Sequence, residues 1–141
     1  MSVEIFSVDK YFVDTFKNDV TMQGYFGGTV RIHVGEAPEK TATPYIVFDE
    51  IETYDRTGVG GVRIFTKPQF SVDVFGSQGY YALKNIADRV DTLLVANSGV
   101  SVEGIWINKF IRDRVVRDVD NIDGVRYWMV RQIYRTIIHP G

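Results

Sequence analysis

The sequence predicts an α+β fold in a single domain covering residues 1–141: a mostly antiparallel β-sheet with two α-helices packed on it, in the order α-β-β-β-α-β-β. Two segments repeat apolar residues at intervals of three and four, as amphipathic helices do. Five segments alternate apolar and polar residues, as half-buried strands do. The length of 141 residues fits one ordinary domain.

The helices are expected at residues 7–20 and 79–96. Ser7 is a natural N-cap for the first, because its hydroxyl can accept a hydrogen bond from an unpaired backbone N–H. Both segments carry an apolar stripe that must pack on a sheet or on a partner. The stripes consist of Val8, Phe12, Phe16 and Val20 in the first helix, and of Tyr80, Leu83, Ile86, Ala87, Val90, Leu93 and Leu94 in the second.

The strands are expected at residues 29–34, 44–52, 69–75, 100–118 and 125–138. In the second strand, "PYIVFDEIE", apolar residues fill both faces only at the start, so we expect its acidic end to emerge into solvent. Pro68 cannot donate a hydrogen bond to a neighbouring strand, which predicts a bulge, an edge position or a break there.

The last two strands are predicted to form a long hairpin around Asp123-Gly124, a strong turn signal. Both of its faces carry large apolar groups. Tyr127, Met129, Ile133 and Ile137 share one face with Arg131 and Arg135, while Trp128, Val130, Tyr134 and Ile138 share the other. Helices cover one side of such a sheet, so the second apolar set indicates a subunit interface.

The composition is that of a globular protein, with 45% hydrophobic and 24% charged residues and a formal net charge of −2. The absence of cysteine excludes a disulfide framework, thiolate metal sites and a cysteine nucleophile. No stretch approaches the roughly 18 consecutive apolar residues of a membrane helix. The first residues carry acids where a secretory signal carries lysine or arginine. We therefore expect a soluble chain that does not contact membranes.

No catalytic motif is found, and neither an enzymatic activity nor a cofactor or metal is expected. His33 and His139 are the two residues that titrate near neutral pH, and each has the position of a surface or edge histidine. Glu50 and Glu52 are expected to share one strand face, where they could form a carboxylate pair. Without a nearby histidine or nucleophile, these acids are better interpreted as a solvated sheet edge.

The C-terminal quarter is locally basic, with seven lysines and arginines against four aspartates in residues 105–141. Arginines interleaved with aromatic residues can bind nucleic acid. A nucleic-acid-binding module in this chain would use Arg112, Arg114, Arg126, Arg131 and Arg135. A half-buried sheet with solvated arginines gives the same pattern and is the favoured interpretation.

The order and spacing of these segments resemble the tail terminator, or tail completion, proteins of long-tailed bacteriophages. The matching stretches are "VRIHVGEAPEKTATPYIVF", "FSVDVFGSQGYYALKNIADRVDTLL" and the final alternating strands, over about residues 7–138. In this family an Ala-Pro loop leads to a Pro-Tyr that opens the second strand, and a Val-x-Val strand feeds directly into the long helix. The corresponding residues are Ala37, Pro38, Pro44, Tyr45, Ile46 and Val47, then Val72 and Val74, and then Ala82, Ala87 and Leu93.

The resemblance implies an α+β protomer that forms a homo-oligomeric ring, expected to be a hexamer, on the head-proximal end of the tail tube. Such a ring stops tube polymerisation and joins the tail to the head connector. Its partners would be the tail tube protein and the head connector or neck protein, and DNA would pass through the lumen without sequence-specific binding. The protein would assemble in the host cytoplasm and reside in the virion tail. A neck or head-completion protein remains the alternative within the virion.

The first candidates for axial or neighbour contacts are the arm from Gly58 to Gly61 and the loop 35–44. The full set of candidate ring or tube contacts is Glu50, Glu52, Arg56, Gly58, Gly60, Gly61, Arg112, Arg114, Arg131 and Arg135.

Overall fold

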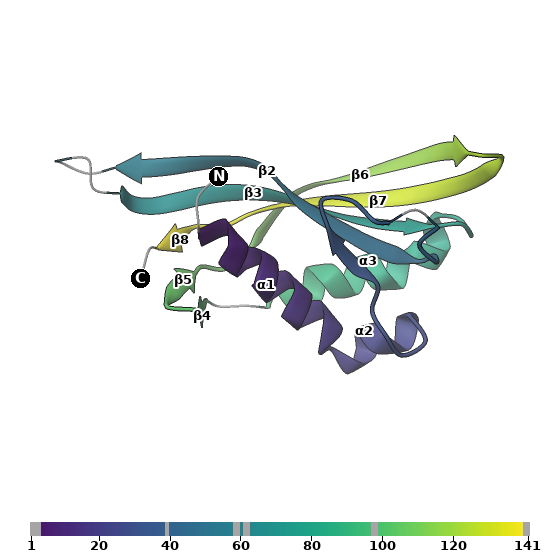
Figure 1. The fold of residues 1–141 in the computed structure, drawn as a ribbon, viewed down its shortest axis with the longest axis horizontal. Coiled ribbons are helices and arrows are strands. Elements are labelled where there is room, and N and C mark those ends of the chain that lie inside the picture. The colour runs from purple at the N-terminus through teal and green to yellow at the C-terminus, as the bar shows by residue number, and fades with distance from the viewer. Residues whose placement is uncertain (1–3, 39, 58–59, 61–62, 97–98, 140–141) are drawn as a thin grey trace.

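The computed structural model describes residues 4–38, 40–57, 60, 63–96 and 99–139. Within them the chain is α+β, as expected, with three helices and an eight-stranded mixed sheet (Figure 1). The elements are α1 (Glu4–Lys17), α2 (Val20–Tyr25), β1 (Ile32–Val34), β2 (Tyr45–Thr57), β3 (Arg63–Gly76), α3 (Tyr80–Val95), β4 (Val100–Val102), β5 (Ile105–Ile107), β6 (Ile111–Ile122), β7 (Val125–Arg135) and β8 (Ile138–His139).

The helix expected at residues 7–20 corresponds to α1, which ends at Lys17, and Ser7 lies inside α1 instead of capping it. The short helix α2, which begins at Val20 after a break, was not predicted. The cause of the break is Asp19. Its carboxylate accepts a hydrogen bond from the backbone N–H of Met22 at 2.8 Å and caps α2. The same carboxylate accepts two hydrogen bonds from Arg89 of α3, at 2.9 and 2.7 Å, which fixes the break against the rest of the molecule.

The strand expected at residues 100–118 is three strands, β4, β5 and β6. Glu103 and Gly104 have φ values of 53° and 80°, so the chain turns between β4 and β5. The last strand is likewise divided into β7 and β8. The turn at Asp123 and Gly124 lies where it was expected, with φ values of 51° and 79°. The predicted order of elements therefore lacks the short elements α2, β4, β5 and β8.

The strand expected at residues 69–75 is longer, since β3 continues through Pro68. The expected irregularity lies in the neighbouring strand, where a β-bulge falls between Glu50 and Glu52 of β2. On the other side of β3, the backbone N–H of Thr136 donates to the Pro68 carbonyl at 3.3 Å, at the junction of β7 and β8. A proline is accommodated here because the pairing changes on both sides of it.

The sheet is forked around β3. Its path runs β1-β2-β3-β8-β5-β4, and β7 also pairs with β3 and carries β6 on its other side. β1 is parallel to β2, and the other described pairs are antiparallel. As a result the β2–β3 hairpin and the β6–β7 hairpin project from the body in opposite directions (Figure 1).

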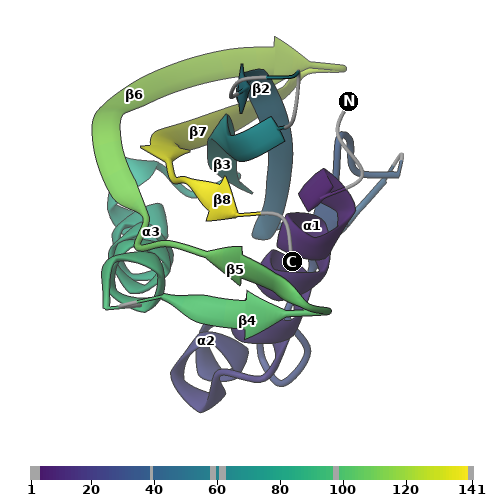
Figure 2. The ribbon, with the colours of Figure 1, turned by 90° about the vertical axis from the view of Figure 1, so that its left-hand side faces the viewer.

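The helices cover one face of the sheet (Figure 2). Phe12 of α1 is fully buried there, with its ring 5.0 Å from that of Phe48, 5.2 Å from Phe70 and 5.3 Å from Phe110. No helix of the described chain covers the opposite face (Figures 1 and 2). We call the opposite face, bearing Tyr45, Asp73, Phe75, Met129 and Arg131, the uncovered face. The helices and the sheet together form a two-layered body, and the two hairpins project from it.

Candidate assembly surfaces

β6 is an edge strand whose described side chains are all exposed. Within the described chain it pairs with β7 and with no other strand. Its apolar side chains are Ile111, Val115, Val116 and Val119, each between 40% and 49% exposed. An edge strand with apolar groups on both faces offers unpaired backbone groups and unburied side chains together. β6 therefore has the character of an interface strand, as the sequence predicted for the hairpin.

The second free edge belongs to β2. β1 pairs with Ile46, Val47 and Phe48, and the described chain offers no strand beside the rest of that edge. The outer part of β2 exposes Ile51 and Tyr54 among acidic residues. The prediction that the acidic end of this strand emerges into solvent is confirmed. β6 and the outer part of β2 thus each offer a free edge with exposed apolar residues.

The uncovered face is organised around an ion pair. Asp73 of β3 lies opposite Arg131 of β7, and the guanidinium donates two hydrogen bonds to the carboxylate, both at 2.9 Å. Hydrogen bonding to Asp73 raises the pKa of Arg131 above its usual range. The rings of Tyr45 and Phe75 stack beside this pair at 5.0 Å. The surface is therefore partly apolar, and the two charges at its centre, those of Asp73 and Arg131, offset each other.

Two other candidate arginines also have carboxylate partners. Arg112 lies 3.7 Å from Asp91 of α3, and Arg135 lies 2.8 Å from Asp113 of β6. Arg126, from the nucleic-acid hypothesis, lies over the ring of Trp128. Arg114 is opposite Ile133 on the uncovered face. Three of the seven bases of residues 105–141, Arg112, Arg131 and Arg135, therefore have a carboxylate partner within the fold. No observation on the described residues favours a nucleic-acid module over the solvated sheet.

The expectation that Glu50 and Glu52 share a strand face is wrong. The bulge between them places Glu50 opposite Phe70, on the helix side, and Glu52 opposite Gln69, on the uncovered face. Glu50 accepts a hydrogen bond from the Thr53 hydroxyl at 2.6 Å. The two carboxylates therefore do not form a pair.

The charge of Glu50 instead affects the pKa of Asp9 in α1. Burial, together with the smaller effects of the negative charges of Asp49 and Glu50, raises the pKa of Asp9 to about 6. On the other side of β2, the hydrogen bond between Tyr54 and Glu52 raises the pKa of the tyrosine. The Asp9 cluster could not be recognised from the sequence, because its members come from α1 and β2.

The arm from Gly58 to Gly61 is described only at Gly60, which has a φ of 84°. Gly58 and Gly61 lie outside the described residues. Arg56 is exposed near the end of β2, opposite Phe65. Arg56 and Gly60 belong to the outer part of the β2–β3 hairpin.

The two histidines do not share a site. His33 is paired with Val47, which lies opposite Asp73 of β3, while His139 lies against Phe65 of the same strand. Eight residues of β3 separate these points, or about 26 Å. Among the described residues no group of three or more histidines, aspartates or glutamates has a geometry suited to a metal ion. The described helices include none long and apolar enough to cross a membrane.

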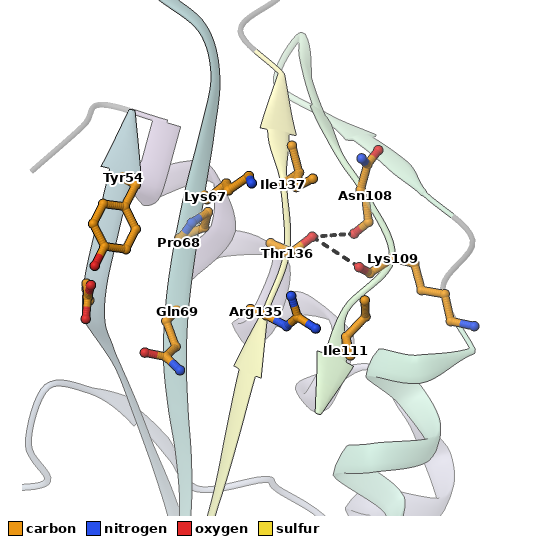
Figure 3. A pocket seen from close by; sticks show the side chains of 11 residues that line it. Tyr54, Lys67, Pro68, Gln69, Asn108, Lys109, Ile111, Arg135, Thr136 and Ile137 are labelled. Atoms are coloured by element: carbon orange, nitrogen blue, oxygen red, sulfur yellow. Dashed lines mark hydrogen bonds between the residues drawn. The ribbon is translucent and has the colours of Figure 1, made fainter. Parts of the chain in front are cut away.

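A pocket of about 570 Å³ opens on the uncovered face where the sheet forks (Figure 3). Its apolar lining residues include Tyr54, Pro68, Ile111 and Ile137, and three basic residues, Lys67, Lys109 and Arg135, also line it. The Thr136 hydroxyl donates to the carbonyl of Asn108 at 2.7 Å, which ties the β7–β8 junction to the β5–β6 turn. Sequence reasoning missed this pocket because only the fork brings residues 52–69 and 108–137 together.

Comparison with known proteins identifies the family. The family model described as "Tail completion protein gp17" matches residues 12–139. The chain belongs to this family. The resemblance inferred from the sequence is thereby confirmed, and the chain is a tail-completion structural protein of phage type.

Two solved structures share the fold of this tail completion protein. One belongs to the "virion of native gene transfer agent (GTA) particle", with a TM-score of 0.71, 14% identity, and coverage of 89% of this chain and 90% of the other. The second carries only a sequence label for a name, with a TM-score of 0.61, 13% identity, and coverage of 96% of each chain. No curated protein matches the chain.

Proposed function

We propose that this tail completion protein is the subunit of a ring, a hexamer, that closes the head-proximal end of the tail tube. The ring stops tube polymerisation and joins the tail to the head connector, and DNA passes through its lumen without sequence-specific binding. The protein acts as a structural component and not as an enzyme. The observation that carries the proposal is the pair of hairpins projecting in opposite directions from one helix-backed sheet (Figure 1).

A ring subunit needs two different surfaces that fit each other on neighbouring copies. Contacts of this head-to-tail kind generate closed rings when the rotation closes. The exposed edge of β6 and the exposed outer part of β2 belong to opposite margins of the β2-β3-β7-β6 part of the sheet. Both carry exposed apolar residues, Val115 on one and Ile51 on the other. The protomer therefore supplies unlike free edges, as lateral ring contacts require.

The axial contacts are proposed to come from the outer β2–β3 hairpin. Glu52 and Arg56 are exposed there, and Gly60 lies between the strands in the left-handed region of φ. Arg114 on β6 is a further exposed candidate. These residues can meet the tube protein on one side of the ring or the neck protein on the other. Arg131 is proposed to act inside the protomer, through its bond to Asp73.

The test is to mix the purified chain separately with cognate tail tubes and with the cognate head connector, and to image both mixtures by negative-stain electron microscopy. The proposal expects ring-shaped density at one end of the tubes. Light scattering of the free chain shows whether the ring forms in solution before it meets the tube or only once the chain binds the tube. Binding to the connector with bare tube ends would replace the proposal with a neck or head-completion function. A monomer that binds neither partner would overturn it.

A further inference from the structure

The far end of the β6–β7 hairpin has no strand partner outside the hairpin within the described chain. β3 ends at Gly76, opposite Trp128 of β7, and the β6–β7 pairing continues beyond that point to Ile122 and Val125. An isolated two-stranded hairpin is only marginally stable in water. We call residues 118–125 the hairpin end. Because the hairpin end extends beyond the body of the protein, it is available for contact with another molecule.

The hairpin end is apolar and acidic at once. Val119 and Val125 are exposed. Asp118, Asp120 and Asp123 are the charged residues of this segment, and it contains no lysine or arginine. The carboxylates of Asp118 and Asp120 accept hydrogen bonds from the backbone of the next residue, and none of the three has an ion-pair partner among the described residues. A surface of this kind fits an apolar pocket with a basic margin.

The pocket at the fork of the sheet has that chemistry. Its walls are apolar at Pro68, Ile111 and Ile137, and three bases line it against one acid, Glu52. Of these bases, Arg135 is bound to Asp113. Lys67 and Lys109 have no ion-pair partner within the part of the chain that the structure describes. The Lys67 ammonium lies 5.4 Å from the centre of the Phe65 ring, and among the described residues neither lysine is bound to a carboxylate of its own chain.

The hairpin end cannot reach the pocket of its own chain. Val125 begins β7 and Arg135 ends it at the pocket, ten residues along the same strand. At about 3.3 Å per residue the separation is about 33 Å. The two complementary surfaces thus lie at different ends of one rigid strand pair, so only a second copy can bring them together. Repeating this unlike contact from copy to copy is what builds a ring.

We propose that the hairpin end of one subunit docks in the pocket of the next subunit, with its valines against the apolar walls and its aspartates beside Lys67 and Lys109. This contact rests on the proposed ring function and adds a second pair of surfaces to the β6 and β2 edges through which neighbouring copies meet. It makes the β6–β7 hairpin the arm that each subunit extends to its neighbour.

Because the chain contains no cysteine, cross-linking can test the contact directly. The double variant Asp120→Cys with Lys67→Cys is assembled on tube ends and treated with a short bismaleimide. The proposal expects a ladder of cross-linked species rising to the full ring. The matched control, Asp120→Cys with Lys84→Cys on α3, and each single variant are expected to give no ladder. Rings that form without a ladder in the first variant would overturn the docking proposal and leave the ring function intact.

Charge reversal gives an independent readout. Asp118→Lys with Asp120→Lys, and separately Lys67→Glu with Lys109→Glu, are each expected to reduce ring assembly about tenfold, since like charges then face each other. All four changes in one chain are expected to restore assembly toward the natural level. Lys84→Glu is the control with no expected effect. Failure of the combined variant to recover, with its circular dichroism unchanged, would contradict the docking, and absence of rings in the unaltered chain would remove the ring function as well.

Discussion

Arg131 and Asp73 face each other across β7 and β3 and are joined by two hydrogen bonds, from Nε to Oδ1 and from Nη2 to Oδ2, each 2.9 Å long. Asp73 is only 5% exposed, although the face on which it lies has no covering layer. The arginine that the sequence suggested as an outward contact therefore neutralises a buried carboxylate. This pair fixes the strand register beneath the base of the β6–β7 hairpin.

Arg131→Gln is expected to destabilise the fold by about 2 to 4 kcal/mol, because the buried Asp73 carboxylate loses its counter-charge. Urea unfolding measured by circular dichroism gives the free energy of unfolding. Arg135→Gln is the matched control, since the Arg135 side chain is 61% exposed. Its loss is expected to cost less than about 1 kcal/mol. Equal costs for the two variants would contradict the role assigned to Arg131.

Asp9→Asn is expected to stabilise the protein at neutral pH. The folded-state pKa of Asp9 is raised from 3.8 to about 6, so the folded state binds the proton more tightly than the unfolded state does. Stability therefore falls as the pH rises from about 4 to about 6 and remains lower above that range. The variant removes this loss. Because Asp9 is only partly buried, we expect a gain of about 1 kcal/mol at pH 7.5 and little change at pH 4.

The free energy of unfolding of both proteins is measured between about pH 4 and pH 8. Asp14→Asn, on an exposed position of the same helix, is the control and is expected to follow the pH dependence of the unaltered chain. Parallel curves for Asp9→Asn and the unaltered chain would show that Asp9 does not titrate as assigned.

Phe12→Ala is expected to cost about 3 to 5 kcal/mol, since it removes the ring at the centre of the aromatic core and leaves a cavity between α1 and the sheet. Thermal and urea unfolding both report this loss. Tyr81→Ala on α3 is the control, because Tyr81 is 88% exposed. Its expected effect is below about 0.5 kcal/mol. A small cost for Phe12→Ala would mean that α1 does not pack as described.

Asp19 carries two separable interactions, the cap of α2 and the ion pair with Arg89. Asp19→Ala removes both and is expected to cost about 2 kcal/mol. Asp19→Asn keeps a capping oxygen and is expected to cost about half as much. The difference between the variants is measured by urea unfolding. Identical losses for both variants would show that the ion pair with Arg89, and not the cap, decides the effect.

The periodic segments could be read from the sequence, and the irregular ones could not. α3 was expected at residues 79–96 and spans Tyr80–Val95, because its apolar stripe is long and unbroken. The hairpin turn at Asp123-Gly124 was recognised by its chemistry. The bulge after Glu50 leaves no pattern in the sequence, and it reverses the face of every later residue in β2. That single extra residue separated Glu50 from Glu52.

The candidate assembly surfaces could be described from the sequence only in part, for a related reason. Apolar residues on both faces of the β6–β7 hairpin could be counted from the sequence, and they indicated an interface. The partners of the arginines could not be read from the sequence. Asp73 lies 58 positions before Arg131, and Asp91 lies 21 positions before Arg112. The pocket beside Pro68 depends on the fork between β7 and β8, which only the folded sheet reveals.

The most direct test of the proposed function is the length of tubes polymerised from the cognate tail tube protein with increasing amounts of this chain. Electron microscopy gives both the length distribution and the occupancy of the ends. The ring function predicts that tubes become shorter as the chain is added and that one end of each carries ring density. An unchanged length distribution with bare ends, at concentrations where the chain is folded, would contradict it.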